Sequence, residues 1–248
     1  MRELEVERGI YFTDLYCIYL SEISTAIISD LHLGFEEEMN LNGLFLPKLQ
    51  RDHVEGMVEK IIDRYDPEKL VINGDFKQEF RKNLPQEWDD VIHFIDRFKD
   101  ITELVFVRGN HDNYLQAILS RRGITQMDSY EDENYFIYHG DRDLKLKKFT
   151  ILGHEHPSVV IRDKVGGVYK VPAFVYSGTH RLAITPAMSF FSSGTDVTQS
   201  LVSEEHFTPV LRSVKDKNFR IFGITDDFGL VDFGRLEDLQ SVNRPPLR

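Results

Sequence analysis

Five apolar runs of this sequence end in side chains that can bind metal, each close to a glycine. The five endings are Asp30-Leu31-His32-Leu33-Gly34, Gly74-Asp75, Gly109-Asn110-His111-Asp112, His139-Gly140-Asp141 and Gly153-His154-Glu155-His156. They offer carboxylate, amide and imidazole donors but no sulfur. Such a donor set suits manganese, iron, zinc or nickel and differs from that of a thiolate zinc finger. The repeated pattern predicts a metal centre.

The number of candidate ligands indicates two ions rather than one. The candidates are Asp30, His32, Asp75, Asn110, His139, His154 and His156. A single tetrahedral ion takes four ligands, so this larger set suits two ions that share a carboxylate. Two ions about 3.5 to 4 Å apart can clamp a phosphoryl group, generate hydroxide at neutral pH and stabilise the leaving oxygen. The chemistry expected of this centre is phosphoester hydrolysis.

The elements that precede these residues explain why they should meet. Amphipathic helices are predicted from Pro47 and from Pro85, and they alternate with strand-like runs at 25–29, 69–73 and 103–107. That order predicts right-handed crossovers and a largely parallel sheet. Ligands of such sheets bind beyond the carboxyl ends of the strands, where successive loops converge.

The spacing inside two blocks predicts which side chains face the centre. Residues two apart on an extended chain point the same way. We therefore expect Asp30 and His32 to face the centre together, and His154 and His156 to do the same. The residues in between should point elsewhere: Leu31 and Glu155.

From about residue 124 onward the sequence predicts mostly short strands. They are expected at 135–138, 149–152, 159–162, 168–171 and 174–176, with a closing hairpin over 219–233. Residues 185–209 are rich in Ser, Thr and Gly and are expected to form a long loop or insertion near the site. We expect one α/β domain over residues 1–248, without a separate capping domain.

Composition restricts the class of protein. The chain has a formal net charge of −11 and a single cysteine, Cys17, which excludes an intrachain disulfide and a thiolate cluster. The start lacks an apolar signal core and no run is long enough to span a membrane, so we expect a cytoplasmic enzyme without membrane contacts.

Because the net charge is negative, binding of nucleic acid would require a local basic patch. The candidates for it are Lys145, Lys147, Lys148, Arg121 and Arg122.

The five blocks, in this order, resemble the calcineurin-like metallophosphoesterases. The stretch from Asp30 to Glu36, the Gly-Asp-Phe-Lys block at 74–77 and the Gly-Thr-Asp block at 194–196 further resemble a small nuclease-related branch. That branch is akin to the archaeal SbcD-related and the bacterial DNA-ligase-associated phosphoesterases. The resemblance implies a four-layer α/β/β/α sandwich, two facing sheets flanked by helices.

The resemblance also implies a role for each motif residue. Asp75 would bridge the two ions, and His111 would be the general acid that protonates the leaving oxygen. The remaining ligands would divide into two sets, with Asp30, His32 and His156 on one ion and Asn110, His139 and His154 on the other.

Gln78 departs from the family pattern. In many members this position holds an acidic or histidine partner of the catalytic histidine. Glutamine can orient an imidazole but cannot stabilise its cation by charge, and Asp112 or Glu79 could supply that charge instead. Two cations adjoin the ligand blocks and are candidates for holding a substrate phosphate: Arg108 and Lys77.

The function predicted from these features is hydrolysis of phosphodiester bonds by a two-metal enzyme of nuclease type. The substrate would be DNA, RNA or a nucleotide diester, and the expected ions are manganese, with iron, zinc or nickel as alternatives. A phosphomonoesterase, including a protein phosphatase, is the second hypothesis. A non-catalytic interaction scaffold is the third, and the intact ligand set argues against it. The sequence predicts no particular oligomeric state.

Overall fold

In the computed structural model the protein is described over residues 1–162, 167–192, 194–200, 208–214 and 218–242. Its first sheet has the strand order β1-β2-β3-β4-β5-β6. Strands β4, β5 and β6 are parallel, as predicted, whereas β1 to β4 pair antiparallel. The strands are β1 (Glu3–Glu7), β2 (Ile10–Thr13), β3 (Ile18–Leu20), β4 (Thr25–Ile28), β5 (Lys69–Asn73) and β6 (Glu103–Val107).

The second sheet is mixed and has the order β13-β10-β11-β12-β9-β8-β7, with β14 paired to β11 and β15 to β14. The predicted runs at 168–171 and 174–176 form one continuous strand, β11, because Pro172 lies inside it without interrupting the pairing. The strands are β7 (Tyr130–Glu131), β8 (Tyr135–Ile137), β9 (Phe149–Leu152), β10 (Pro157–Arg162), β11 (Val168–Ser177), β12 (Leu182–Ile184), β13 (Thr195–Asp196), β14 (Arg220–Thr225) and β15 (Gly229–Arg235).

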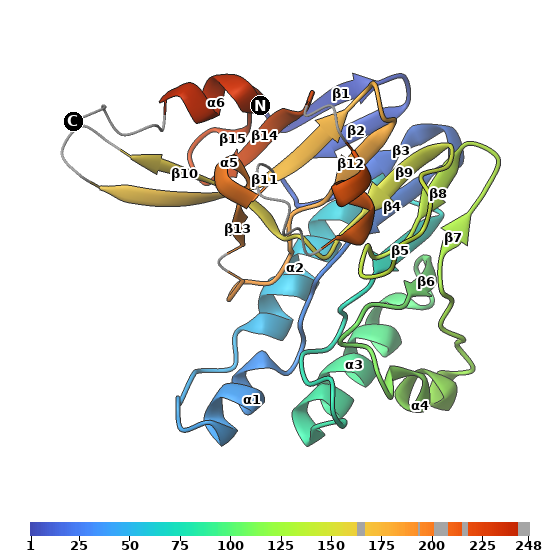
Figure 1. The fold of residues 1–248 in the computed structure, drawn as a ribbon. Coiled ribbons are helices and arrows are strands. Elements are labelled where there is room, and N and C mark those ends of the chain that lie inside the picture. The colour runs from blue at the N-terminus through green and yellow to red at the C-terminus, as the bar shows by residue number, and fades with distance from the viewer. Residues whose placement is uncertain (163–166, 193, 201–207, 215–217, 243–248) are drawn as a thin grey trace.

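Four helices gather on one side of the molecule (Figure 1). They are α1 (Phe35–Leu41), α2 (Gln50–Tyr65), α3 (Pro85–Phe98) and α4 (Leu115–Leu119). Helix α3 begins at the predicted proline, but α2 begins at Gln50 and not at Pro47. The reason is a contact from another helix: the Glu36 carboxylate accepts the N–H groups of Leu49 and Gln50 at 2.8 and 2.7 Å and so fixes the first turn there.

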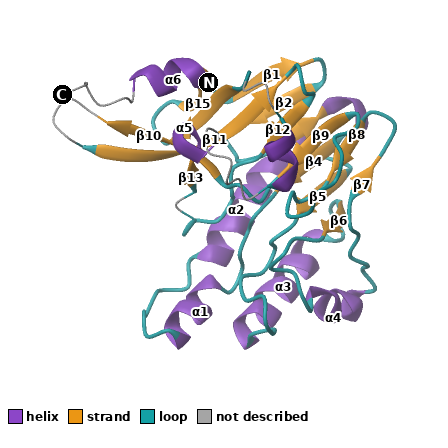
Figure 2. Cartoon of the chain, viewed as in Figure 1, coloured by secondary structure: helices purple, strands orange, loops and turns teal. Residues whose placement is uncertain are grey.

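Buried apolar clusters separate four layers. Phe94 of α3 packs between the helices and the first sheet. Phe12 of the first sheet stacks on Phe174 of the second, with ring centroids 4.6 Å apart. On the outer face of the second sheet the core includes Leu236, where α6 (Leu236–Val242) begins. The α/β/β/α sandwich is therefore confirmed, and Figure 2 shows strands flanked by helices.

The segment 185–209 contains more structure than a loop. Its start is held on the end of β4, because Met188 N donates to Ser29 O at 3.0 Å and Ser189 N to Asp30 O at 3.1 Å. Farther along it forms β13 and a one-turn helix, α5 (Val197–Ser200). Residues 193 and 201–207 of this segment lie outside the described residues. None of the described helices is long and apolar enough to cross a membrane.

Candidate metal centre

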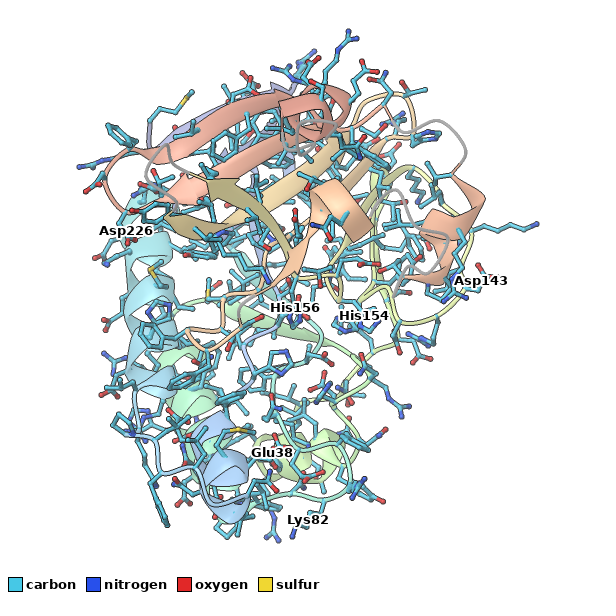
Figure 3. The ribbon with its side chains drawn as sticks, turned by 60° about the vertical axis from the view of Figure 1, so that its left-hand side comes forward. Glu38, Lys82, Asp143, His154, His156 and Asp226 are labelled. Atoms are coloured by element: carbon cyan, nitrogen blue, oxygen red, sulfur yellow. The ribbon has the colours of Figure 1, made fainter. Side chains whose placement is uncertain are left out.

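The predicted ligands converge in two groups that share one carboxylate. Asp30, His32, Asp75 and His156 form the first group, and Asp75, His139 and His154 form the second, with donor atoms in each group within 4.8 Å of one another. Figure 3 labels His154 and His156 near the centre of the molecule. The structure thus places six of the seven predicted ligands in two clusters around Asp75.

In the first group the donor atoms face a common point. His156 Nε2 lies 3.0 Å from Asp30 Oδ1 and 3.3 Å from His32 Nε2. His32 Nε2 lies 4.0 Å from Asp75 Oδ2. Two imidazole nitrogens that face each other beside two carboxylates form the arrangement of donors that surrounds a cation.

A backbone carbonyl orients His139 in the second group. His139 Nδ1 lies 3.0 Å from the carbonyl oxygen of Asn73, which leaves Nε2 facing the centre. Nε2 lies 3.3 Å from Asp75 Oδ2 and 3.2 Å from Asn110 Oδ1. The Asn110 amide, the seventh predicted ligand, therefore also reaches this group.

The backbone that presents the ligands differs from the prediction. Asp30, His32, His154 and His156 have φ values of 58°, 49°, 67° and 43°, so they lie in left-handed turns and not on extended chain. The strands end before these residues, and each turn redirects its side chain toward the centre. Positive φ is unfavourable for residues with a β-carbon and is concentrated at functional sites.

The two intervening residues lie outside the ligand groups, as expected. Leu31 is fully buried in the core between the helices and the first sheet. Glu155 accepts the N–H of Thr208 at 2.5 Å and so holds the segment that follows 201–207.

Two glycines allow the loops to approach this closely. A β-carbon on Gly74, which has a φ of 81°, would lie 2.2 Å from His139 Nδ1. A β-carbon on Gly109 would lie 2.3 Å from the backbone nitrogen of Asp75. Any larger residue at these positions would push the second ligand group apart.

Charge in the centre favours cations. Burial opposes protonation of His139, but the carboxylates of Asp75 and Asp30 outweigh it and raise the pKa of His139 to about 10. Burial lowers the pKa of His32 to about 4. Burial alone would raise the pKa of Asp75, yet the nearby imidazoles hold this pKa below its ordinary value. Two buried, ionised carboxylates among imidazoles fit a pair of divalent cations.

His111 lies beside the ligand groups without belonging to either. Its ring centroid is 5.1 Å from that of His32, and its backbone N–H donates to Asp75 Oδ1 at 2.9 Å. Its Nδ1 contacts the carbonyl oxygen of Gln78. The amide of the Gln78 side chain instead donates to Glu38 Oε2 at 2.6 Å. The expectation that this side chain orients the imidazole is therefore wrong, because its backbone carbonyl does so.

Asp112 holds the two central loops together and does not contact the His111 ring. Its buried carboxylate accepts the N–H groups of Phe76 and Gly109 at 2.9 and 2.8 Å. Burial, reinforced by the charge of Asp75, raises the pKa of Asp112 to about 6.

The two cations predicted to hold a substrate phosphate, Lys77 and Arg108, differ in exposure. The Lys77 side chain is fully buried, and its ammonium lies 3.7 Å from Glu87 Oε2 and 3.2 Å from the carbonyl oxygen of Lys82. Lys77 therefore cannot reach a substrate, and that expectation is wrong. Arg108 is exposed and its guanidinium donates to Asn113 Oδ1 at 2.9 Å.

The predicted basic patch is largely neutralised by ion pairs. Lys147 and Lys148 lie 3.5 and 3.1 Å from the carboxylate of Glu131. Arg122 donates two hydrogen bonds to Asp96 at 2.6 and 2.5 Å. Arg121, the neighbour of Arg122 in the predicted patch, lies over the Trp88 ring, with its guanidinium carbon 5.7 Å from the ring centroid.

Sequence reasoning missed residues that orient the ligands. Ser192 Oγ lies 2.8 Å from His156 Nδ1, and the carbonyl oxygen of Asn73 lies against His139 Nδ1.

Sequence reasoning also missed helix α1, whose three consecutive glutamates contact α2, α3 and Gln78. The run Glu36-Glu37-Glu38 was the available signal, but an acidic run is usually a solvated face.

Comparison with known proteins gives a family and a related fold. Residues 23–177 match the family model described as calcineurin-like phosphoesterase. A nuclease from Pseudomonas putida, MPE, shares the fold with a TM-score of 0.65 and 20% identity, covering 90% of this chain and 96% of its own. A phosphoesterase from E. coli, YfcE, has a TM-score of 0.42 and 15% identity, covering 85% of this chain and 98% of its own. A search among curated protein sequences found no match.

Proposed function

Because this chain belongs to the calcineurin-like phosphoesterase family, we propose that it hydrolyses phosphodiester bonds in DNA, RNA or nucleotide diesters as a two-metal enzyme. The observation that carries the proposal is the pair of ligand groups that share Asp75, with His111 beside them. The motif resemblance to the nuclease-related branch supports a diester rather than a monoester substrate.

The proposed division of ligands follows the two groups. Asp30, His32 and His156 would hold one ion, and Asp75, which belongs to both groups, would serve both ions. When bound, two divalent ions polarise the phosphoryl oxygens and supply a nucleophile at neutral pH. The ligands of the other ion would be Asn110, His139 and His154. Manganese is the expected metal, and iron, zinc and nickel are the alternatives.

The role of His111 follows from the position of its ring. Since Nδ1 lies against the Gln78 carbonyl oxygen, Nδ1 carries a proton and donates it there. The other ring nitrogen, Nε2, is then the atom that can hold a proton for the leaving oxygen. His111 acts as the general acid in this proposal.

The test is hydrolysis by the purified protein, supplied in turn with Mn²⁺, Mg²⁺, Zn²⁺ or Ni²⁺. The substrates are bis-p-nitrophenyl phosphate, p-nitrophenyl phosphate, and labelled single- and double-stranded DNA and RNA. We expect preference for diesters. Strong preference for the monoester would instead favour a phosphomonoesterase, including a protein phosphatase.

Variants separate an enzyme from a scaffold. Asp75→Asn and Asn110→Ala should each lower turnover by at least about a hundredfold, since even the loss of a residue that only supports a ligand costs about 10- to 100-fold. Asp143→Asn, an exposed carboxylate away from the ligand groups (Figure 3), is the matched control and should leave turnover unchanged. Activity that survives both ligand substitutions would establish contamination or a non-catalytic scaffold.

A further inference from the structure

A surface cleft lies beside the loops that carry Phe80 and Asp112, the residue that follows His111. Phe80, Arg108, Asn113, Tyr114 and Gln126 are among the residues that line it. The Phe80 ring stands edge-on to the His111 ring, with centroids 5.9 Å apart and an interplanar angle of 81°. We call this surface the His111 cleft.

Two aromatic side chains of the His111 cleft are open to solvent. Phe80 is 44% exposed and Tyr114 is 61% exposed. Tyr114 has a φ of 70°, which is unfavourable for a residue with a β-carbon. Its carbonyl oxygen accepts a hydrogen bond from Asn83 Nδ2 at 3.1 Å. This bond ties the loop after β5 to the loop after β6. Positive φ in a residue with a β-carbon is concentrated at functional sites, and exposed aromatic rings are suited to ligand contact.

The rim of the His111 cleft is locally basic although the chain carries a net charge of −11. Arg81 and Lys82 follow Phe80 directly, and Arg108 lines the cleft; all three are exposed. The Arg81 guanidinium lies 5.2 Å from the centroid of the Phe80 ring. Within the described part of the chain none of the three forms an ion pair with a carboxylate. They differ in this from the paired cations Lys147, Lys148 and Arg122.

Gln126 supplies a spare hydrogen-bond donor at the same place. Its backbone N–H donates to Gln116 Oε1 at 2.7 Å, which fixes the residue at the cleft. Its side-chain Nε2 is buried and has no hydrogen-bond partner among the described residues. A buried amide donor without a partner is costly, and an oxygen acceptor on a ligand would satisfy it.

We propose that the His111 cleft binds the nucleoside on the leaving side of the cleaved phosphodiester. This inference rests on the proposed function. In the reaction, the water oxygen bonds to phosphorus as the P–O bond to the leaving oxygen breaks. The leaving oxygen takes a proton from His111, the attacking water loses a proton to solvent, and His111 regains its proton from solvent. The nucleoside that departs with that oxygen must therefore lie on the His111 side, where Phe80 and Tyr114 can stack on its base and Arg108 can contact the next phosphate.

This chemistry favours single strands and tolerates any base. Every base has a face that stacks on an aromatic ring, whereas a base inside a duplex is already stacked between its neighbours. The unpaired cations of the rim would contact the backbone without reading sequence. The ligand class is thus a single-stranded nucleic acid or a short nucleotide diester.

The experiment uses the metal-loaded full chain and short single-stranded oligonucleotides. One oligonucleotide carries all its bases, and two others carry one abasic residue on either side of the cleaved linkage. The leaving side is identified as the fragment that ends in a free hydroxyl. The measurements are kcat and KM for the native chain, for the Phe80→Ala, Tyr114→Ala double variant, for Phe80→Tyr, and for Phe228→Ala. Phe228 is an exposed phenylalanine in the β14–β15 turn and serves as the matched control.

For the native chain, loss of the leaving-side base should lower kcat/KM by roughly tenfold, in line with stacking on one or two rings. In the double variant the complete and abasic oligonucleotides should be cleaved equally well. Phe80→Tyr should retain the base effect, and Phe228→Ala should behave as the native chain.

Three outcomes would overturn the inference and leave the proposed function standing. They are an equal base effect in the native chain and the double variant, a base effect confined to the other side of the linkage, and hydrolysis of bis-p-nitrophenyl phosphate without cleavage of any oligonucleotide. Failure to hydrolyse either class of diester would instead remove the proposed function.

Discussion

The ring of His111 is held by the backbone of Gln78, while the side chain of Gln78 is held by Glu38. His111 Nδ1 contacts the Gln78 carbonyl oxygen, and Gln78 Nε2 donates to Glu38 Oε2 at 2.6 Å. The contact that orients the imidazole is therefore available to any residue at position 78. The unusual glutamine at this position leaves the support of the His111 ring intact.

Substitution of Gln78 should consequently have little effect on catalysis. We expect Gln78→His and Gln78→Ala to keep kcat for bis-p-nitrophenyl phosphate within about twofold, because neither removes the carbonyl that accepts from Nδ1. His111→Asn, which removes the imidazole, should lower kcat by about a hundredfold or more. A collapse of turnover in Gln78→Ala with metal content intact would show that the side chain has a role of its own.

Ser192 should support metal binding through His156. Its hydroxyl lies 2.8 Å from His156 Nδ1, so it fixes which ring nitrogen faces the centre. Ser192→Ala should weaken metal affinity by roughly 10- to 100-fold, the usual cost of losing such a partner. Metal content after dialysis against graded concentrations of free Mn²⁺ measures the effect. Ser120→Ala, at an exposed serine whose hydroxyl donates to the carbonyl of Ala117, is the control and should retain native affinity.

Metal binding should release protons at neutral pH. In the metal-free site the carboxylates outweigh burial and raise the pKa of His139 to about 10, and the pKa of His156 is also raised. The His139 imidazole therefore holds a proton at pH 7, and a metal ion must displace it because only the neutral ring coordinates. Affinity should rise by about tenfold per pH unit for each proton released, up to the pKa of the group.

Calorimetric titration with Mn²⁺ at pH 7, in two buffers of different ionisation enthalpy, measures this release. We expect at least about one proton per protein molecule. His139→Gln should release fewer protons than the native chain. An observed heat that is independent of the buffer would contradict the charge assignment of the centre.

Glu36 should contribute to stability as well as to the start of α2. Its buried carboxylate accepts the N–H groups of Leu49 and Gln50 and the amide of Gln86, at 2.8, 2.7 and 3.0 Å. Glu36→Ala would leave these donors unpaired and should lower the free energy of unfolding by about 3 kcal/mol. Urea denaturation of the metal-free protein measures it. Glu237→Ala, at an exposed glutamate of α6, should change stability by far less. Equal midpoints for the two variants would refute the capping role.

The sequence by itself determined the fold class and the set of residues that meet. Apolar periodicity and motif order predicted β4, β5, β6, α3 and β9 and placed the metal-competent residues after strand ends. Such features follow from local pattern and from the rule that parallel strands present their carboxyl ends at one edge. The start of α2 was predicted at Pro47 because proline suits a first turn, whereas the distant cap from Glu36 decided it.

Only the tertiary structure decided how each side chain is used. The sequence placed Lys77 beside a ligand block, but burial against Glu87 removes it from the substrate. Gln78 likewise contributes its carbonyl and not its side chain. Local sequence cannot predict such outcomes, because they depend on which distant groups are brought within hydrogen-bonding distance and on how much water each side chain loses. The open aromatic and basic rim beside His111 arises in the same way, from two loops that meet only in the folded chain.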